Sequence, residues 1–279
     1  MIMIIIQNSE QFRAVVPSSV SADDDTFTGL SDFFDTAEQW LSDTFSGQPL
    51  LEAVASESDT KIRRIFQRII IAKAMITGSP SMDLVMTPNG FAVTSNQNLA
   101  PASKERVERL IDSLKQTSDL ALEQAFILIC SNENYFSLFR SGSTFEMLTR
   151  SLIWAPSFLR AYAGYAFASW GTLSDLRPVI DDCERRISCF ISPEYYSELI
   201  EYRRSRTKDP DNENALQFIY QIVGASLKKI PDYPYIELLL NLLNRNPKKY
   251  PTYINSDTYK LKIFDRYENK KEDSAYFFG

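Results

Sequence analysis

The sequence predicts a mainly α-helical protein made of two related helical modules in tandem, the first with an inserted β-hairpin and an extended arm. Three observations predict this. Apolar residues recur at helical spacing along most of the chain, the order of these stripes in the first half recurs in the second, and one stretch of the first half switches to short apolar runs around a turn. The 279 residues are 44% hydrophobic and 24% charged, enough for one or two buried cores.

The first strong helix is expected from Leu30 to Phe45. Asp32 and Asp35 lie in its first turn, where the helix dipole favours anions, and Ser31 or Thr28 is expected to cap its start. Gly47 and Pro49 follow as stop signals. The apolar stripe consists of Leu30, Phe33, Phe34, Ala37, Trp40, Leu41 and Phe45.

The apolar run from Met1 to Ile6 is too short to span a membrane and lacks the basic flank and cleavage site of a signal peptide. We expect it to form a strand in an intracellular protein.

A second helix is predicted around Ile62 to Ile70, with a basic face of Lys61, Arg63, Arg64 and Arg68, and a third from Ser103 to Leu114. Between them, at about 82–95, the runs 84–87 and 91–94 flank Pro88, Asn89 and Gly90, residue types that a tight reversal needs. This pattern predicts a β-hairpin. The polar residues 95–101 that follow are expected to form an ordered extended arm.

The second half repeats the order of these helices. The stripe at 30–45 matches residues 176–191 at a separation of 146, and Pro49 and Pro193 each open a following helix. Residues 65–72 match 218–225 at a separation of 153, and 107–114 match 236–243 at 129. The difference between 153 and 129 gives the first copy 24 extra residues, including the hairpin and arm. Because any two amphipathic helices align on their stripes, chance similarity remains open for each pair taken alone.

These observations predict a first module over residues 1–150 and a second over 151–279, the latter with a docked C-terminal tail. The apolar and aromatic segment from Leu152 to Trp170 is expected to pack between the modules, because it is too apolar for a solvated linker.

The sequence offers little for catalysis. It contains no histidine, which removes Ser-His and Cys-His pairs and His-ligated zinc. Its three cysteines lack C-x-x-C spacing, and neither phosphate-loop glycine pattern occurs. The acidic groups at 23–25 and at Asp181, Asp182 and Glu184 lack the order of a calcium loop and are interpreted as solvated. We therefore expect no catalytic residue, cofactor or metal.

Charge is distributed unevenly. The formal net charge is -6, which disfavours tight nucleic-acid binding. Residues 14–60 contain ten acidic residues and no Lys or Arg, whereas basic residues gather at 203–208 and, among aromatic residues, at 248–271. An acidic face on one subunit could meet a basic face on the next in a head-to-tail contact, and such contacts can close into a ring. Two alternatives stay open: both faces only confer solubility, or the aromatic basic stretch binds single-stranded nucleic acid.

Five stretches of the chain carry a resemblance to known sequences: residues 30–45, 63–74, 87–93, 96–107 and 267–279. They resemble an uncharacterised family found in tailed phages and prophages of gut anaerobes, whose helix order is similar to that of head-tail connector (adaptor) proteins. The resemblance covers most of the chain, and its motifs are structural in character, with no chemistry attached. An apparent duplication departs from the simplest single-module connector.

This resemblance implies a structural virion protein without enzymatic activity. Connector proteins form rings, commonly of twelve copies, between the portal and the tail, and DNA passes through the lumen without specific binding. The implied partners are copies of the chain, the portal protein and tail or further adaptor proteins, with no membrane; assembly takes place in the host cytoplasm. The alternative is a cytoplasmic helical protein-protein interaction module. The candidate interaction residues are Pro88, Asn89, Gly90, Phe91, Asn96, Gln97, Asn98, Tyr276, Phe277 and Phe278.

Overall fold

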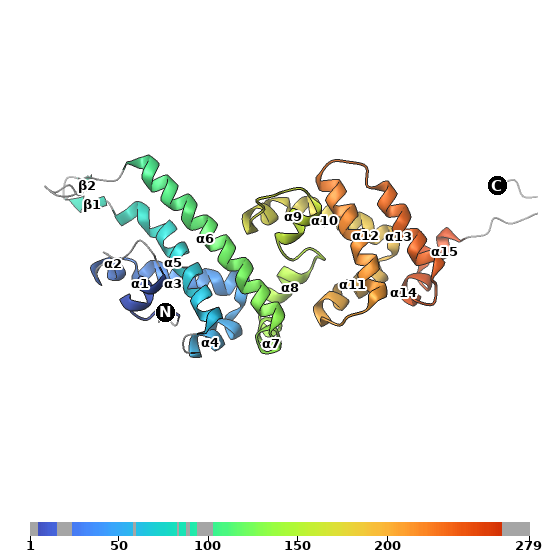
Figure 1. The fold of residues 1–279 in the computed structure, drawn as a ribbon, viewed down its shortest axis with the longest axis horizontal. Coiled ribbons are helices and arrows are strands. Elements are labelled where there is room, and N and C mark those ends of the chain that lie inside the picture. Colours follow the sequence, from blue (N-terminus) through green and yellow to red (C-terminus); the bar gives the residue numbers. More distant parts are fainter. Residues whose placement is uncertain are drawn as a thin grey trace, which may run out of the picture. The chain divides into compact units, whose positions relative to one another are not determined.

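The structure is a computed structural model that describes residues 5–15, 24–57, 60–82, 84–87, 90–93 and 103–263. These residues are mainly helical (Figure 1). The chain divides into two compact units, Met1–Leu148 (unit 1) and Thr149–Gly279 (unit 2). The boundary predicted from the sequence lies two residues later, between 150 and 151.

Unit 1 opens with α1 (Ser9–Val15), α2 (Asp24–Gly29) and α3 (Ser31–Leu41). The helix predicted to reach Phe45 changes its winding after Leu41 into the π-helix η2 (Ser42–Ser46), because the amide of Gly47 donates to the carbonyl of Ser42, 2.9 Å away and five residues earlier. Leu30 precedes α3 without a side-chain cap, so the expected capping by Ser31 or Thr28 is wrong.

The predicted N-terminal strand is also wrong for the residues that can be checked. Ile5 and Ile6 are buried but lie in an irregular segment, and residues 1–4 are outside the described part of the chain.

The core of unit 1 is formed by α3, α4 (Gln48–Ser56), α5 (Lys61–Met82) and α6 (Lys104–Ser131), followed by α7 (Glu133–Ser141) and α8 (Thr144–Thr149). α5 and α6 pack along each other (Figure 1). α6 continues 17 residues beyond the predicted end at Leu114, and the buried residues of α6 lie in that continuation. The buried apolar side chains of this core include Phe34, Leu41, Leu50, Val54, Phe66, Ile69, Ile70, Ala121, Ala125 and Ile129.

Two strands lie between α5 and α6. β1 (Leu84–Thr87) and β2 (Gly90–Val93) pair antiparallel, with Leu84 opposite Val93 and Thr87 opposite Gly90. Both strands fall within the stretch assigned to the hairpin from the sequence. Figure 1 shows them at the ends of α5 and α6.

Unit 2 consists of α9 (Ser157–Tyr162), α10 (Trp170–Ile191), α11 (Pro193–Ser205), α12 (Pro210–Leu227), α13 (Tyr233–Arg245), α14 (Pro251–Ile254) and α15 (Asp257–Lys262). Ser169 and Thr172 form a capping box at the start of α10, and Pro193 opens α11 as predicted. The core includes Leu152, Ile153, Phe158, Leu159, Ile180, Ile187, Tyr195, Leu199, Ile219, Val223, Leu239 and Leu243. The segment expected to pack between the modules contributes six residues to this core, which include Ala163 and Ala168.

Candidate functional site

The most distinctive polar feature of unit 1 is a buried carboxylate that holds the chain's N-terminal segment. Glu38, on α3, is 2% exposed, and its Oε1 accepts from the amide of Ile5 at 2.7 Å and of Ile6 at 3.4 Å. On the other side, Arg63 and Gln67 of α5 both donate to the carbonyl of Ile5 at 3.3 Å. We call Glu38, Arg63 and Gln67 the unit 1 clamp, because an acceptor and two donors hold one extended segment between two helices.

Unit 2 contains a second clamp. Glu184 of α10 is 4% exposed, and its Oε1 accepts from the amide of Leu152 at 2.9 Å and the hydroxyl of Ser151 at 3.0 Å. Arg177, two turns earlier on α10, donates to the carbonyl of Ile153 at 3.1 Å. We call Glu184 and Arg177 the unit 2 clamp. It fixes residues 151–153, which lie near the beginning of unit 2.

Further contacts fasten both ends of this segment. Arg150 forms an ion pair with Asp181 at 2.7 Å, and the indole of Trp154 donates to the carbonyl of Ser151 at 2.6 Å. The guanidinium of Arg203 lies 4.7 Å from the ring centroid of Trp154, within cation–π distance. Residues 150–154 are therefore held by both α10 and α11.

Burial dominates the electrostatics of the unit 2 clamp. It raises the pKa of Glu184 to about 7, although hydrogen bonds from Tyr196, Leu152 and Ser151 and the charge of Arg177 act in the opposite direction. Burial also lowers the pKa of Arg177 and raises that of Tyr196, whose hydroxyl faces Glu184. A carboxyl in this setting can bind a proton near neutral pH.

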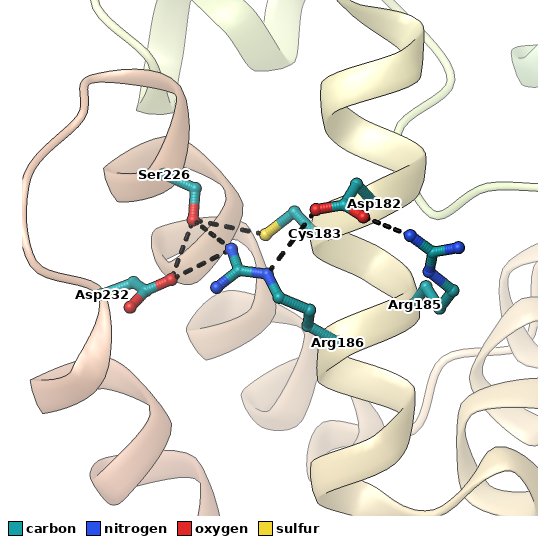
Figure 2. A network of polar contacts seen from close by, with 6 residues as sticks. All are labelled: Asp182, Cys183, Arg185, Arg186, Ser226 and Asp232. Atoms are coloured by element: carbon teal, nitrogen blue, oxygen red, sulfur yellow. Dashed lines mark hydrogen bonds and ion pairs between the residues drawn. The ribbon is translucent and has the colours of Figure 1, made fainter.

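A neighbouring polar network joins α10 to the end of α12 and the loop before α13 (Figure 2). The hydroxyl of Ser226 donates to Asp232 at 2.9 Å and accepts from Arg186 at 3.1 Å and from the thiol of Cys183 at 3.4 Å. Burial raises the pKa of that thiol, which keeps it protonated and a weak nucleophile. The network ties elements together and does not activate Cys183.

The acidic residues that were predicted to be solvated therefore lie in two different environments. Asp182 interacts with Arg185 and Arg186 on the helix surface (Figure 2), whereas Glu184 is buried, so its assignment to a solvated face is wrong. The same correction applies to Arg63, placed on a basic face by the sequence but buried in the unit 1 clamp. The sequence pattern does contain a signal for both glutamates, because each lies within an apolar stripe rather than opposite it.

The predicted basic groups are partly paired within unit 2. Arg204 donates to the hydroxyl of Thr149 at 3.0 Å and to Glu201 at 2.7 Å, and Lys249 pairs with Asp211 at 2.8 Å. Lys262 donates to the carbonyl of Phe190 at 2.5 Å. Much of this charge is thus committed to neighbouring residues. Of the predicted acidic face, Asp32, Asp43 and Glu52 are exposed.

Most of the candidate interaction residues lie outside the described part of the chain. These are Pro88, Asn89, Asn96, Gln97, Asn98, Tyr276, Phe277 and Phe278. Gly90 and Phe91 begin β2, where Phe91 pairs with Met86.

The neighbourhood of β1 and β2 does contain a surface that the sequence analysis did not single out. No residue of α6 between Lys104 and Thr117 is buried, although Val107, Leu110, Ile111 and Leu114 form an apolar stripe there. Leu110 is 41% exposed.

A family model described as "Family of unknown function (DUF6712)" matches residues 26–146 and 232–263. Neither the curated proteins nor the solved structures include a match to the chain. Among the described helices, none is both long and apolar enough to cross a membrane. The described residues also contain no group of three or more acidic or cysteine side chains placed to hold a metal ion.

Proposed function

The chain belongs to DUF6712, a family of unknown function, and we propose that it is a structural subunit of a phage head-tail connector, the ring between portal and tail. The resemblance of residues 30–45, 63–74, 87–93, 96–107 and 267–279 to connector-like phage proteins motivates this role. In it the protein resides in the virion after assembly in the host cytoplasm, and DNA passes through the ring without being read.

The observation that carries the proposal is an apolar projection on unit 1. We use this name for residues 75–82 of α5, β1, β2 and residues 104–114 of α6. Among its residues whose side chains are described, only Gly78 is buried. A helix that carries an apolar stripe and leaves it half exposed is suited to contact another protein. In a ring, that protein is a neighbouring copy or the portal.

The two units are proposed to be copies of one module, and the clamps support this. Glu38 and Glu184 are 146 residues apart, as are Ile6 and Leu152, whose amides they accept. After the first long helix, Gly47 in unit 1 and Ser192 in unit 2 have nearly the same backbone angles, with φ 71° and ψ 158° against φ 83° and ψ 144°. Gly47 and Ser192 are 145 residues apart, one fewer than the 146 that separate Glu38 and Glu184. Unit 1 therefore has one extra residue between Glu38 and Gly47, and η2 accounts for it because a π-turn accommodates one more residue than an α-turn.

The following helices also correspond. The buried residues Ile62, Phe66, Ile69, Ile70 and Ala74 of α5 match buried residues of α12 at the predicted separation of 153: Ala215, Ile219, Ile222, Val223 and Leu227.

The separation of 129 residues predicted for the last helix pair disagrees with which residues of the two helices are buried. It aligns the exposed Leu110 with Leu239, which is 1% exposed. A separation of 118 aligns the buried Ala121 and Ala125 with the buried Leu239 and Leu243. The two alignments differ by 11 residues, close to three helical turns, which is why both match the stripe.

The projection is then the part of unit 1 that unit 2 lacks. The extra length is the difference between 153 and 118, 35 residues, instead of the 24 inferred from the sequence. It extends α5 beyond the match of α12 and adds β1, β2 and the first turns of α6. An insertion that adds exposed apolar surface to one of two copies is an element for assembly rather than for core packing.

Light scattering of the purified chain, alone and with portal protein, tests the proposal. The wild type is expected to form a ring-sized oligomer, on its own or on the portal. Leu110→Asp should prevent this assembly, because it places a charge in the stripe. Leu120→Asp is the matched control: this leucine, 61% exposed on the same helix, lies outside the projection.

A wild-type protein that stays monomeric and does not bind portal would contradict the proposal. A one-to-one complex with another protein, lost in Leu110→Asp, would instead favour the helical interaction module.

A further inference from the structure

We propose that docking of residues 150–154 onto α10 is coupled to protonation of Glu184, so that this segment is held more firmly at mildly acidic than at alkaline pH. The coupling is independent of the connector role. It concerns the first residues of unit 2, where the chain enters from unit 1.

Residues 150–154 cover the carboxyl group of Glu184. Both Ser151 and Leu152 donate to Glu184, and the side chain is almost without contact to solvent while they are in place. When the segment leaves, the carboxyl loses two donors and gains water. Exposure to water favours the ionised carboxylate far more than a buried site does.

Within the described part of the chain, the donors to the Glu184 carboxylate are Ser151, Leu152 and Tyr196, and none of them is a lysine or an arginine. The charge of Arg177 acts on Glu184, but the NH1 group of Arg177 donates to the carbonyl of Ile153. Asp181, also on α10, is itself paired with Arg150. The burial penalty on the charge is therefore only partly offset.

On the neighbouring elements, the phenol hydroxyl of Tyr196 on α11 donates to Glu184. Arg203 of α11 instead donates to the hydroxyl of Tyr220 on α12, at 2.6 Å. Asp232, before α13, bonds Ser226 and Arg186, and Lys262 of α15 bonds the carbonyl of Phe190. A pKa of about 7 in the docked state agrees with this setting.

The sign follows from linkage. The pKa of Glu184 is about 7 when the segment is docked, and we expect it to return to the ordinary glutamate value of 4.5 when the segment is released and water reaches the carboxyl group. The docked state therefore binds more protons between these values, so docking is strongest below pH 4.5, weakens as pH rises and reaches a plateau above 7. Between pH 6 and pH 8 the opening equilibrium is expected to rise about tenfold.

Amide hydrogen exchange at Leu152, corrected for intrinsic exchange, measures this opening in the full-length protein. The wild type should show the tenfold rise from pH 6 to pH 8. Glu184→Gln should remove it, because glutamine keeps an acceptor oxygen but cannot ionise. Glu38→Gln, the same change in the unit 1 clamp, should leave the pH dependence at Leu152 intact.

A Glu184→Gln protein that keeps the full pH dependence would overturn the proposal. Carbon-13 NMR of the glutamate carboxyl groups in the wild type supplies a second measurement if that variant does not fold. One carboxyl titrating near pH 7 is expected, and titration of every glutamate below about pH 5.5 would overturn the coupling.

Discussion

Gly224 illustrates, at the scale of one residue, how closely unit 2 is packed. A Cβ atom added there would lie 2.5 Å from the carbonyl oxygen of Tyr162 and 2.9 Å from its carbonyl carbon. These are backbone atoms, which cannot turn away as the end of a side chain can. Glycine is therefore required by the close approach of α12 to the end of α9.

We expect Gly224→Ala to reduce the free energy of unfolding by about 1–3 kcal/mol, since the added methyl group forces the backbone to shift. Chemical denaturation followed by circular dichroism measures this. Gly29→Ala is the control, because a Cβ there has no other atom within 4 Å. Equal stability of the two variants would show that the approach at Tyr162 is not constraining.

The buried glutamates mark the limit of sequence reasoning at this scale. Their positions inside the apolar stripes at 30–45 and 176–191 could be read from the sequence. Their acceptor role could not, because the amides they hold are 33 residues away for Ile5 and 32 for Leu152. Helical spacing reports which residues share a face and carries no information on which distant segment covers that face.

The π-helix η2 is the feature that matters most at the scale of an element. If it arose as one residue added to a helix like α10, removing one residue should return the helix to regular winding. The exposed Thr44 lies within it.

We expect deletion of Thr44 to give a folded protein with a modest loss of stability. Deletion of Asp182, exposed within the regular α10, should instead unfold unit 2, because it rotates every later residue of the helix by about 100°. Circular dichroism and thermal denaturation of the two proteins give the comparison. If both deletion variants unfold, the interpretation of η2 as the result of one added residue is wrong.

Helix α6 shows why the boundaries of elements were only partly predictable. The apolar stripe is more regular in the first turns of α6 than in the later ones, and the helix end was therefore predicted at Leu114. The residues that enter the core are Ala121, Leu122, Ala125, Phe126 and Ile129. Small alanines in that stretch weaken the hydrophobic signal, and they are buried because α5 packs close along them.

At the scale of the whole molecule, each unit has its own buried core, and the two cores should unfold separately. We expect calorimetry to show two transitions. Gly224→Ala should lower the temperature of one. Gly47→Ala should lower the other, because Gly47 has a φ of +71° and a Cβ there would lie 3.0 Å from the Cα of Gly142. One transition that shifts equally with both variants would show that the cores unfold as one.

By itself, the sequence determined the helical class, the positions of the long helices and the pattern shared by the two halves. Those properties follow from local spacing of apolar residues, which acts over a few turns and is visible without knowing the contacts. Only the tertiary structure decided which stripe is buried, that residues 104–117 of α6 stay out of the core, and that Glu38 and Glu184 hold distant segments. Burial and hydrogen bonding across tens of residues depend on how the helices pack, and stripes that repeat about every 11 residues leave that packing register undetermined.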